Sequence, residues 1–272
     1  MFCKKCGAQM DDSAKVCPSC GASTEAKAPV VAGGPVEKAR ANPLFLAAVI
    51  CLSVVALFQL VGVFQGGGQM GSVLDMAGMG GVNALVMLIG LISLAITVVI
   101  LVGLWFVYVS GLNSAQAPLL AMGLHLTNIG VLAEMIYMIV ALGFAALIML
   151  IVAIGGGSLV GQYSSDAAGA VAAVGIVGLL IVGGIGALMV IFYLKARAAV
   201  QMAESTVAAG KLTGVPVMFV PVMCFVLGGL ELVAALMSGG NALALLNGLA
   251  STGAYILFGI VALQYRNENM AA

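Results

Sequence analysis

The sequence predicts an all-α polytopic membrane protein that crosses the bilayer about six times and carries a small cysteine-rich domain at its N-terminus. Of its 272 residues, 63% are apolar and only 7% are charged, whereas a soluble domain carries about 25% charged residues. The mean hydropathy is +1.21. Such a chain lacks the polar surface that a soluble fold needs, so we expect it to be embedded in the lipid bilayer. Four of its six cysteines lie within the first twenty residues.

The charge balance excludes a nucleic-acid-binding protein, and the N-terminal pattern excludes a protein with a secretory signal. Ten basic and ten acidic residues balance, and a nucleic-acid partner would require clustered excess lysine and arginine. The first apolar run begins near Leu44, too far from the start for a secretory signal. We therefore expect the N-terminal segment to stay in the cytosol, where thiols remain reduced and metal binding is favoured over disulfides.

Residues 1–22 contain two copies of one pattern, fourteen residues apart: an apolar residue, C-x2-C, glycine and alanine. Each C-x2-C brings two thiolates to one ion, and the glycine that follows (Gly7 or Gly21) accepts a positive φ. Two such pairs supply four sulfurs in the closed tetrahedron of structural Zn²⁺. The predicted zinc ligands are Cys3, Cys6, Cys17 and Cys20.

Through these cysteines and glycines, residues 1–22 resemble the short zinc-ribbon domain found at the ends of many bacterial membrane proteins. The resemblance implies a cell-membrane location and says little about activity. The first pair encloses Lys4 and Lys5, where the family often has proline, as at Pro18. Free or disulfide-bonded cysteines are one alternative. A redox C-x-x-C motif is another, although the βαβ pattern that usually accompanies it is not visible. With sulfur at all four positions, no site stays open for a zinc-bound water.

A flexible linker is predicted for 23–42, which mixes alanine, proline, glycine and charges. A six-helix transmembrane domain, 43–266, and a short C-terminal tail, 267–272, follow. A helix needs about 20 residues to cross a ~30 Å hydrocarbon layer. Six stretches qualify: 44–64, 84–109, 129–154, 171–194, 217–237 and 244–265.

Basic residues set the predicted orientation. With six spans, all ten face one side, so both termini are expected to be cytoplasmic in the cell membrane. Without the sixth span, which Asn247 and Gly248 interrupt, Arg266 would face outward. The outer loops then contain no lysine or arginine: 65–83, 155–170 and 238–243.

A weak repeat pairs the spans into three helical hairpins. Each outer loop carries a glycine cluster, and "YVSGLNSAQ" from Tyr108 matches "YLKARAAVQ" from Tyr193 at an offset of 85. Convergence explains these features equally well, because interfacial tyrosines are common. We expect 195–211 to prolong the fourth span as a helix and 114–127 to lie along the interface; both are candidate contacts for the ribbon.

Ionisable residues inside membrane spans are functional hypotheses by default, and Glu134 and Glu231 qualify. Either they handle ions or protons along a path, or they are carboxyls near an interface or protonated carboxyls hydrogen-bonded between helices. We place them in opposite membrane halves, without direct pairing. His125, the only histidine, is a pH sensor or simply solvated. Cys51 and Cys224 fall within spans and are expected to act as small apolar residues.

No catalytic set emerges. The chain lacks a G-x-x-x-x-G-K-[ST] loop, and no Ser/His/Asp triad can be assembled, so we expect no enzyme. Glycines such as those in 175–188 favour close helix packing, which is compatible with an oligomer. The first hypothesis is a ribbon that binds a cytoplasmic protein or docks on the inner loops. The second is a small transporter or channel regulated by the ribbon, and the third is a redox or metal sensor.

Overall fold

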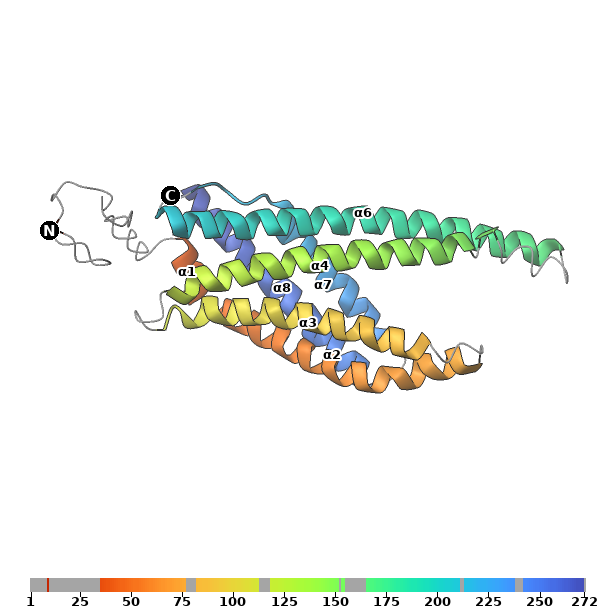
Figure 1. Ribbon diagram of the computed structural model, residues 1–272. Helices are drawn as coiled ribbons and strands as arrows, with labels where there is room; N and C mark the ends of the chain where they lie inside the picture. Colours follow the sequence, from red (N-terminus) through yellow and green to blue (C-terminus); the bar gives the residue numbers. More distant parts are fainter. Residues whose placement is uncertain are drawn as a thin grey trace.

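The computed structural model describes Gln9 and residues 35–76, 82–112, 118–151, 153–154, 165–210, 213–237 and 242–271. The predicted zinc ligands Cys3, Cys6, Cys17 and Cys20 lie outside the described residues. The described helices (Figure 1) are α1 (Pro35–Ala41), α2 (Pro43–Met76), α3 (Val82–Val109), α4 (Pro118–Ile151), α6 (Ser165–Ala209), α7 (Phe219–Leu236) and α8 (Ala242–Ala271).

Six of these helices are long and apolar enough to cross a membrane, which confirms the predicted number of spans. The sixth, Ala242–Met270, has the lowest hydropathy of the set, 1.6. It contains the polar interruption at Asn247 and Gly248 and is nevertheless continuous. A helix satisfies its own backbone hydrogen bonds, so scattered polar side chains do not break it. The protein is therefore a multi-pass, all-α membrane protein.

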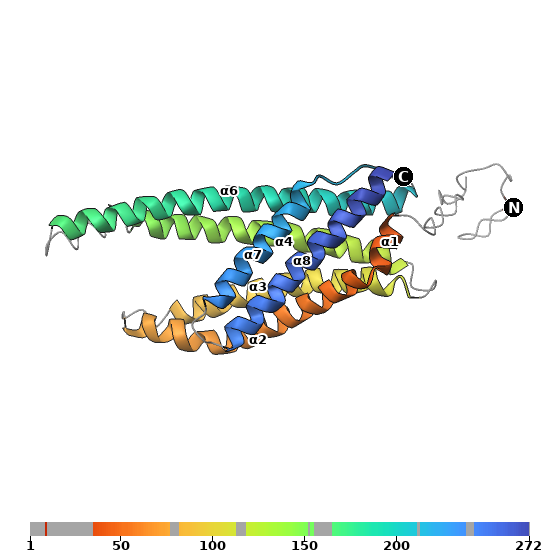
Figure 2. The ribbon, with the colours of Figure 1, turned by 180° about the vertical axis from the view of Figure 1, so that it is seen from behind.

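The predicted hairpins are present as packed pairs: α2 with α3, α4 with α6, and α7 with α8. In addition, α3 packs on α4 and α2 packs on α8, so the first hairpin lies between the other two. A short contact between α6 and α7 joins the outer hairpins (Figure 2). The second hairpin therefore packs on one side of the first and the third hairpin on the other, so the order of the hairpins in space differs from their order in the chain.

Small residues let several pairs of helices approach each other closely. A Cβ added to Gly123 of α4 would lie 2.6 Å from the carbonyl oxygen of Gly103 of α3. On α8, a Cβ at Gly248 would collide with the Cβ of Ala235 on α7. Close approach of this kind is how helices associate in lipid, where no hydrophobic effect drives them together.

Helices extend beyond several predicted spans, although the candidate spans Pro43–Phe64 and Met87–Val109 agree closely with the predicted 44–64 and 84–109. The glycine cluster in predicted loop 65–83 continues α2 as far as Met76, and α6 begins at Ser165, inside predicted loop 155–170. The expected interfacial segment 114–127 is also wrong, because α4 begins at Pro118 and runs straight into the third span. Each added helical residue gains a backbone hydrogen bond, which outweighs the roughly 1 kcal/mol cost of a glycine.

The extension of the fourth span is confirmed, since α6 runs without interruption to Ala209. The matching segments after Tyr108 and Tyr193 differ in structure, however. The first ends its helix within two residues, and the second continues helically. This part of the repeat does not reflect equivalent structure.

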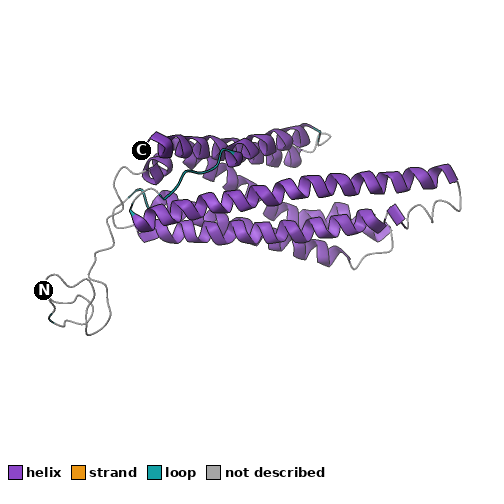
Figure 3. Cartoon of the chain, turned by 90° about the horizontal axis from the view of Figure 1, so that it is seen from above, coloured by secondary structure: helices purple, strands orange, loops and turns teal. Residues whose placement is uncertain are grey.

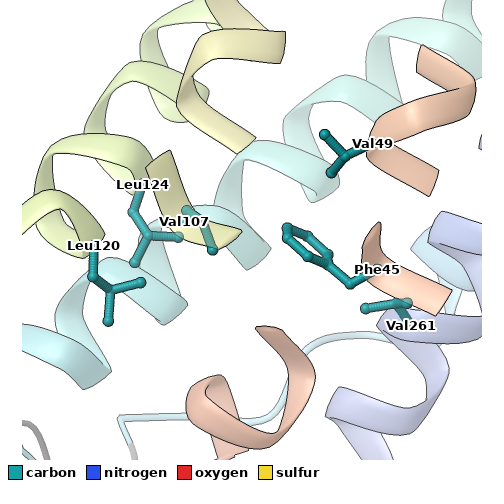
Figure 4. Packing of buried hydrophobic residues seen from close by; sticks show 6 residues of the cluster. All are labelled: Phe45, Val49, Val107, Leu120, Leu124 and Val261. Atoms are coloured by element: carbon teal, nitrogen blue, oxygen red, sulfur yellow. The ribbon is translucent and has the colours of Figure 1, made fainter. Parts of the chain in front are cut away.

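Two predicted non-membrane segments are partly helical: α1 occupies the end of the 23–42 linker, and α8 extends into the 267–272 tail. Both lie at the end of the bundle where α2, α4 and α7 begin and α3, α6 and α8 end (Figures 1 and 3). We call this the head end and the opposite end the distal end. The largest buried apolar cluster is at the head end (Figure 4) and comprises Phe45, Val49, Val107, Leu120, Leu124 and Val261. We call it the head core.

Candidate functional site at the head end

The helix that follows the linker is anchored in the bundle. Arg40 of α1 is only 8% exposed. One guanidinium nitrogen, Nη1, donates a hydrogen bond to Ser110 Oγ at the end of α3, at 2.7 Å, and Nη2 lies 2.7 Å from Glu37 Oε1. A buried arginine is stable only when its charge is paired. Glu37 of the same helix supplies that charge, whereas the buried Nε has no hydrogen-bond partner. The bond to Ser110 is therefore the polar contact of Arg40 that holds α1 against the bundle.

Apolar packing supports the same attachment. Val36 and Ala39 of α1 pack against the head core. Glu37 and Arg40 lie one turn apart, so their ion pair occupies one face of the short helix. Isolated helices of seven residues are unstable in water, and tertiary contacts therefore hold α1 in its conformation.

Asn42 connects α1, α2 and α8. Its Oδ1 accepts a hydrogen bond from the Leu44 backbone N–H at 2.9 Å, which caps the start of α2. Its Nδ2 donates to Gln264 Oε1 of α8. Lys38 Nζ lies 3.7 Å from Glu268 Oε2, an exposed pair that contributes little. The chain therefore enters the membrane domain between α3 and α8.

The second hairpin has its own polar contacts at the head end. His125 Nδ1 of α4 lies 3.2 Å from Glu204 Oε1 of α6. Arg197 Nε donates to Asn128 Oδ1 at 3.2 Å. His125 stands out in the sequence as the only histidine, whereas its partner Glu204 does not, because 79 residues separate the two.

The two membrane glutamates occupy different hairpins, Glu134 on α4 and Glu231 on α7. Among the described residues, neither carboxylate forms a hydrogen bond or ion pair. Both side chains are partly buried.

Metal-binding side chains do not gather in the described part of the chain. No group of three or more His, Cys, Asp or Glu residues could hold an ion there. Cys51 and Cys224 are free thiols in α2 and α7.

Comparison with known proteins identifies the N-terminal segment. Residues 2–24 match the family model of the zinc-ribbon domain, and this range includes all four predicted ligands. The predicted zinc ribbon is thus confirmed as a domain, and domains of this family generally bind zinc. No curated protein and no solved structure matches the chain. The chain is a membrane protein with an N-terminal zinc-ribbon module.

Proposed function

We propose that the zinc ribbon is a cytoplasmic interaction or regulatory module, coupled to the membrane domain through α1, and that the chain is not itself an enzyme. The burial of Arg40 carries this proposal. A ribbon that served only as a freely tethered domain would need no buried, hydrogen-bonded attachment at the membrane end of its linker.

The donor set fits a zinc ion. Two C-x2-C pairs provide four thiolates, the tetrahedral set of a structural site. Cys3, Cys6, Cys17 and Cys20 would hold the ion. Bound zinc would supply folding free energy to a segment that is too small to build its own core. The glycines after each pair would allow the turns that direct backbone N–H groups toward the sulfurs.

The linker confines the ribbon to the head end. Ten residues, 25–34, connect the ribbon match to α1 and span at most about 35 Å when fully extended. A partner that binds the ribbon is therefore held beside the head core. A pull on the ribbon that extends the linker reaches Arg40, and displacing a buried charged donor from its partners costs about 1–3 kcal/mol for each hydrogen bond.

Basic residues support a cytoplasmic head end. Between residues 41 and 194 the chain has no lysine or arginine. Short loops rich in lysine and arginine face the cytosol, so both termini are proposed to do so, in the cell membrane. The basic residues that the structure describes are Lys38, Arg40, Lys195, Arg197 and Arg266.

Hydrogen exchange tests the coupling. The full-length protein in lipid nanodiscs is compared with zinc bound and after chelation. We expect peptides covering 35–44 to exchange faster without zinc in the wild type. In the Arg40→Ala variant, we expect fast exchange in both states. Equal exchange with and without zinc in the wild type would show that the ribbon does not act on α1.

A crosslinking experiment tests the interaction role. A photoreactive group placed in the ribbon is activated in intact membranes. Crosslinks to a defined protein, or to the head end of the same chain, should disappear in Cys3→Ser and remain in Cys51→Ser, which leaves the ribbon unchanged. If Cys3→Ser leaves the crosslinks intact, the folded ribbon is not the binding module.

A thiol-labelling experiment tests the orientation. A cysteine is added at the C-terminus, and an impermeant reagent is applied to intact cells. No labelling is expected before permeabilisation. Ready labelling of intact cells would contradict a cytoplasmic C-terminus.

A further inference from the structure

The third hairpin contains a helix N-terminus that lacks a capping side chain. Helix α7 begins at Phe219, and Met218 before it forms no side-chain capping bond. Val220 and Pro221 in the first turn are buried. In the described part of the chain, the backbone N–H groups of Phe219 and Val220 have no hydrogen-bond partner. Because the N–H groups of a buried helix end need partners, this end indicates a ligand that supplies them.

Arg266 of α8 lies beside this N-terminus. The two helices pack against each other, and α8 continues past the start of α7 (Figure 2). Where they touch, a Cβ added to Gly259 of α8 would lie 3.1 Å from the Cys224 Cβ of α7. From this contact, Phe219 is about 7.5 Å back along α7 and Arg266 is about 10.5 Å onward along α8. Arg266 follows Gly259 by two helical turns, so it lies on the face of α8 that meets α7, about 3 Å beyond the level of Phe219.

Two side chains at this point of α8 have buried polar atoms without a hydrogen-bond partner. These atoms are Arg266 Nε and both amide atoms of Asn269, a residue that is only 6% exposed. Asn269 follows Arg266 by three residues, so the two side chains are neighbours on the helix. In the described part of the chain, Arg266 forms no ion pair. Buried polar groups are almost always hydrogen-bonded in folded proteins, so both side chains point to the same missing partner as the α7 N–H groups.

The carboxylate closest to Arg266 along the chain interacts with α1. Glu268 follows Arg266 by two residues and therefore lies on the opposite side of α8. There, its Oε2 lies 3.7 Å from Lys38 Nζ. Gln264 accepts a hydrogen bond from Asn42, also toward α1. The contacts with α1 thus leave the Arg266 side of α8 unused.

The chemistry of these groups favours an anion. Free N–H groups and the helix dipole attract negative charge to a helix N-terminus, and an arginine adds a full positive charge with several donors. A phosphate group presents oxygens in several directions, so it accepts hydrogen bonds from α7 and α8 together. Val217 and Met218, which precede α7, are exposed. A ligand therefore reaches the helix end from outside the bundle.

We propose that the N-terminus of α7, together with Arg266 and Asn269 of α8, binds a phosphate group, either free in solution or in the headgroup of a phospholipid. The N–H groups of Phe219 and Val220, the Arg266 guanidinium and Asn269 Nδ2 donate to its oxygens. The site belongs to the third hairpin and does not depend on the role proposed for the zinc ribbon.

Thermal unfolding tests the binding of free phosphate. The full-length protein in detergent is heated while sodium phosphate replaces sodium chloride at constant ionic strength. Phosphate should raise the melting temperature of the wild type, because a ligand of the folded state stabilises it. Arg266→Gln should weaken phosphate binding about ten- to a hundredfold, since a charge-assisted hydrogen bond is lost. Asn269→Leu removes a neutral donor and should weaken it up to about tenfold.

Native mass spectrometry tests the phospholipid. The same variants are titrated with phosphatidylglycerol, and the bound molecules are counted. If the headgroup is the ligand, the wild type should retain one lipid that Arg266→Gln loses, and free phosphate should have little effect on the melting temperature. If free phosphate is the ligand, the melting temperature should respond and lipid retention should not differ between the variants. Either result supports the phosphate site and identifies its source.

Two further variants separate this site from general charge effects and from damage. Lys195→Gln removes an exposed cation on α6 and should keep wild-type binding. Met218→Asp places a carboxylate at the start of α7, where it competes with the ligand and suits the helix dipole. This variant should be at least as stable as the wild type and should no longer bind phosphate or the lipid. Wild-type protein that binds neither probe would overturn the proposal, and so would equal binding by folded Arg266→Gln and Met218→Asp or an equal loss in Lys195→Gln.

Discussion

The two ends of the bundle are held together differently. At the head end, helices from all three hairpins surround one buried core, and side-chain hydrogen bonds connect residues far apart in the chain. Toward the distal end, the α4–α6 hairpin diverges from the α2–α3 hairpin (Figures 1 and 2). Many large apolar side chains there are exposed, including Leu180, Leu236 and Met237. Lipid replaces protein contacts at that end, so specific packing is concentrated where the ribbon is attached.

Removing zinc should produce the largest effect, on the ribbon itself and on the adjoining α1, and should leave the rest of the membrane domain intact. Structural zinc contributes on the order of 10–16 kcal/mol to comparable small domains. After chelation, or in Cys3→Ser, we expect the N-terminal residues to lose exchange protection while the melting temperature of the membrane domain changes little. Exchange mass spectrometry and thermal unfolding measure the two effects. If the melting temperature of the membrane domain fell as well, the stability of the bundle would depend on the ribbon.

Matched leucine truncations should show the difference between the two ends directly. Leu120 in the head core is 1% exposed, whereas Leu180 on α6 is 72% exposed. Leu120→Ala should lower the free energy of unfolding by about 2–5 kcal/mol through cavity formation, and Leu180→Ala should have little effect. The only tryptophan, Trp105, packs against the head core and reports its unfolding by fluorescence. Equal losses would mean that packing is uniform along the bundle.

Glycine-to-alanine substitutions compare closely packed with open positions of the bundle and should change the free energy of unfolding less than the leucine truncations. A Cβ at Gly123 would press on the backbone of α3, whereas Gly183 has open space around it. Gly123→Ala should destabilise by about 1–3 kcal/mol through overpacking. Gly183→Ala should be neutral or stabilising by up to about 1 kcal/mol, because alanine favours the helix. Unfolding in detergent measures the change in the free energy of unfolding for both variants. A Gly123→Ala variant that is more stable than the wild type would refute the close α3–α4 contact.

The smallest effect is expected at the exposed pair between α4 and α6. Glu204→Gln removes the partner of His125, and such surface pairs contribute about 0–1 kcal/mol. Thermal unfolding at low and high salt should differ less for the variant than for the wild type, because salt screens the pair. A larger loss would show that this contact supports the head end.

Much of the fold could be predicted because membrane spans leave a strong one-dimensional signal. The centres of all six spans were correct, and so were the three hairpins. Helix ends were not: the glycine run after Phe64 predicts a loop, yet α2 continues to Met76. Local propensity is weak compared with the need to satisfy backbone hydrogen bonds away from water. Glycine therefore ended helices less often than its behaviour in soluble proteins suggests.

The candidate sites likewise comprise residues that the sequence reveals and residues that only the helix packing brings together. The four ribbon cysteines stand out because their spacing is local, and their role as zinc ligands stays a prediction. Arg40 and Ser110 lie 70 residues apart, and no periodicity connects them. Glu134 and Glu231 were visible as unusual residues, but their placement on two different hairpins depends on the pairing of the helices.

The sequence by itself determined the class of the protein: apolar composition and span length require six helices in a bilayer, and the paired cysteines specify a zinc ribbon. Only the tertiary structure decided that the first hairpin lies between the other two, that Arg40 anchors α1, and that the outer hairpins meet where α6 contacts α7. The physical reason is that composition and spacing act within one segment. Contacts between distant segments depend on the shape and tilt of complete helices, which no single segment encodes.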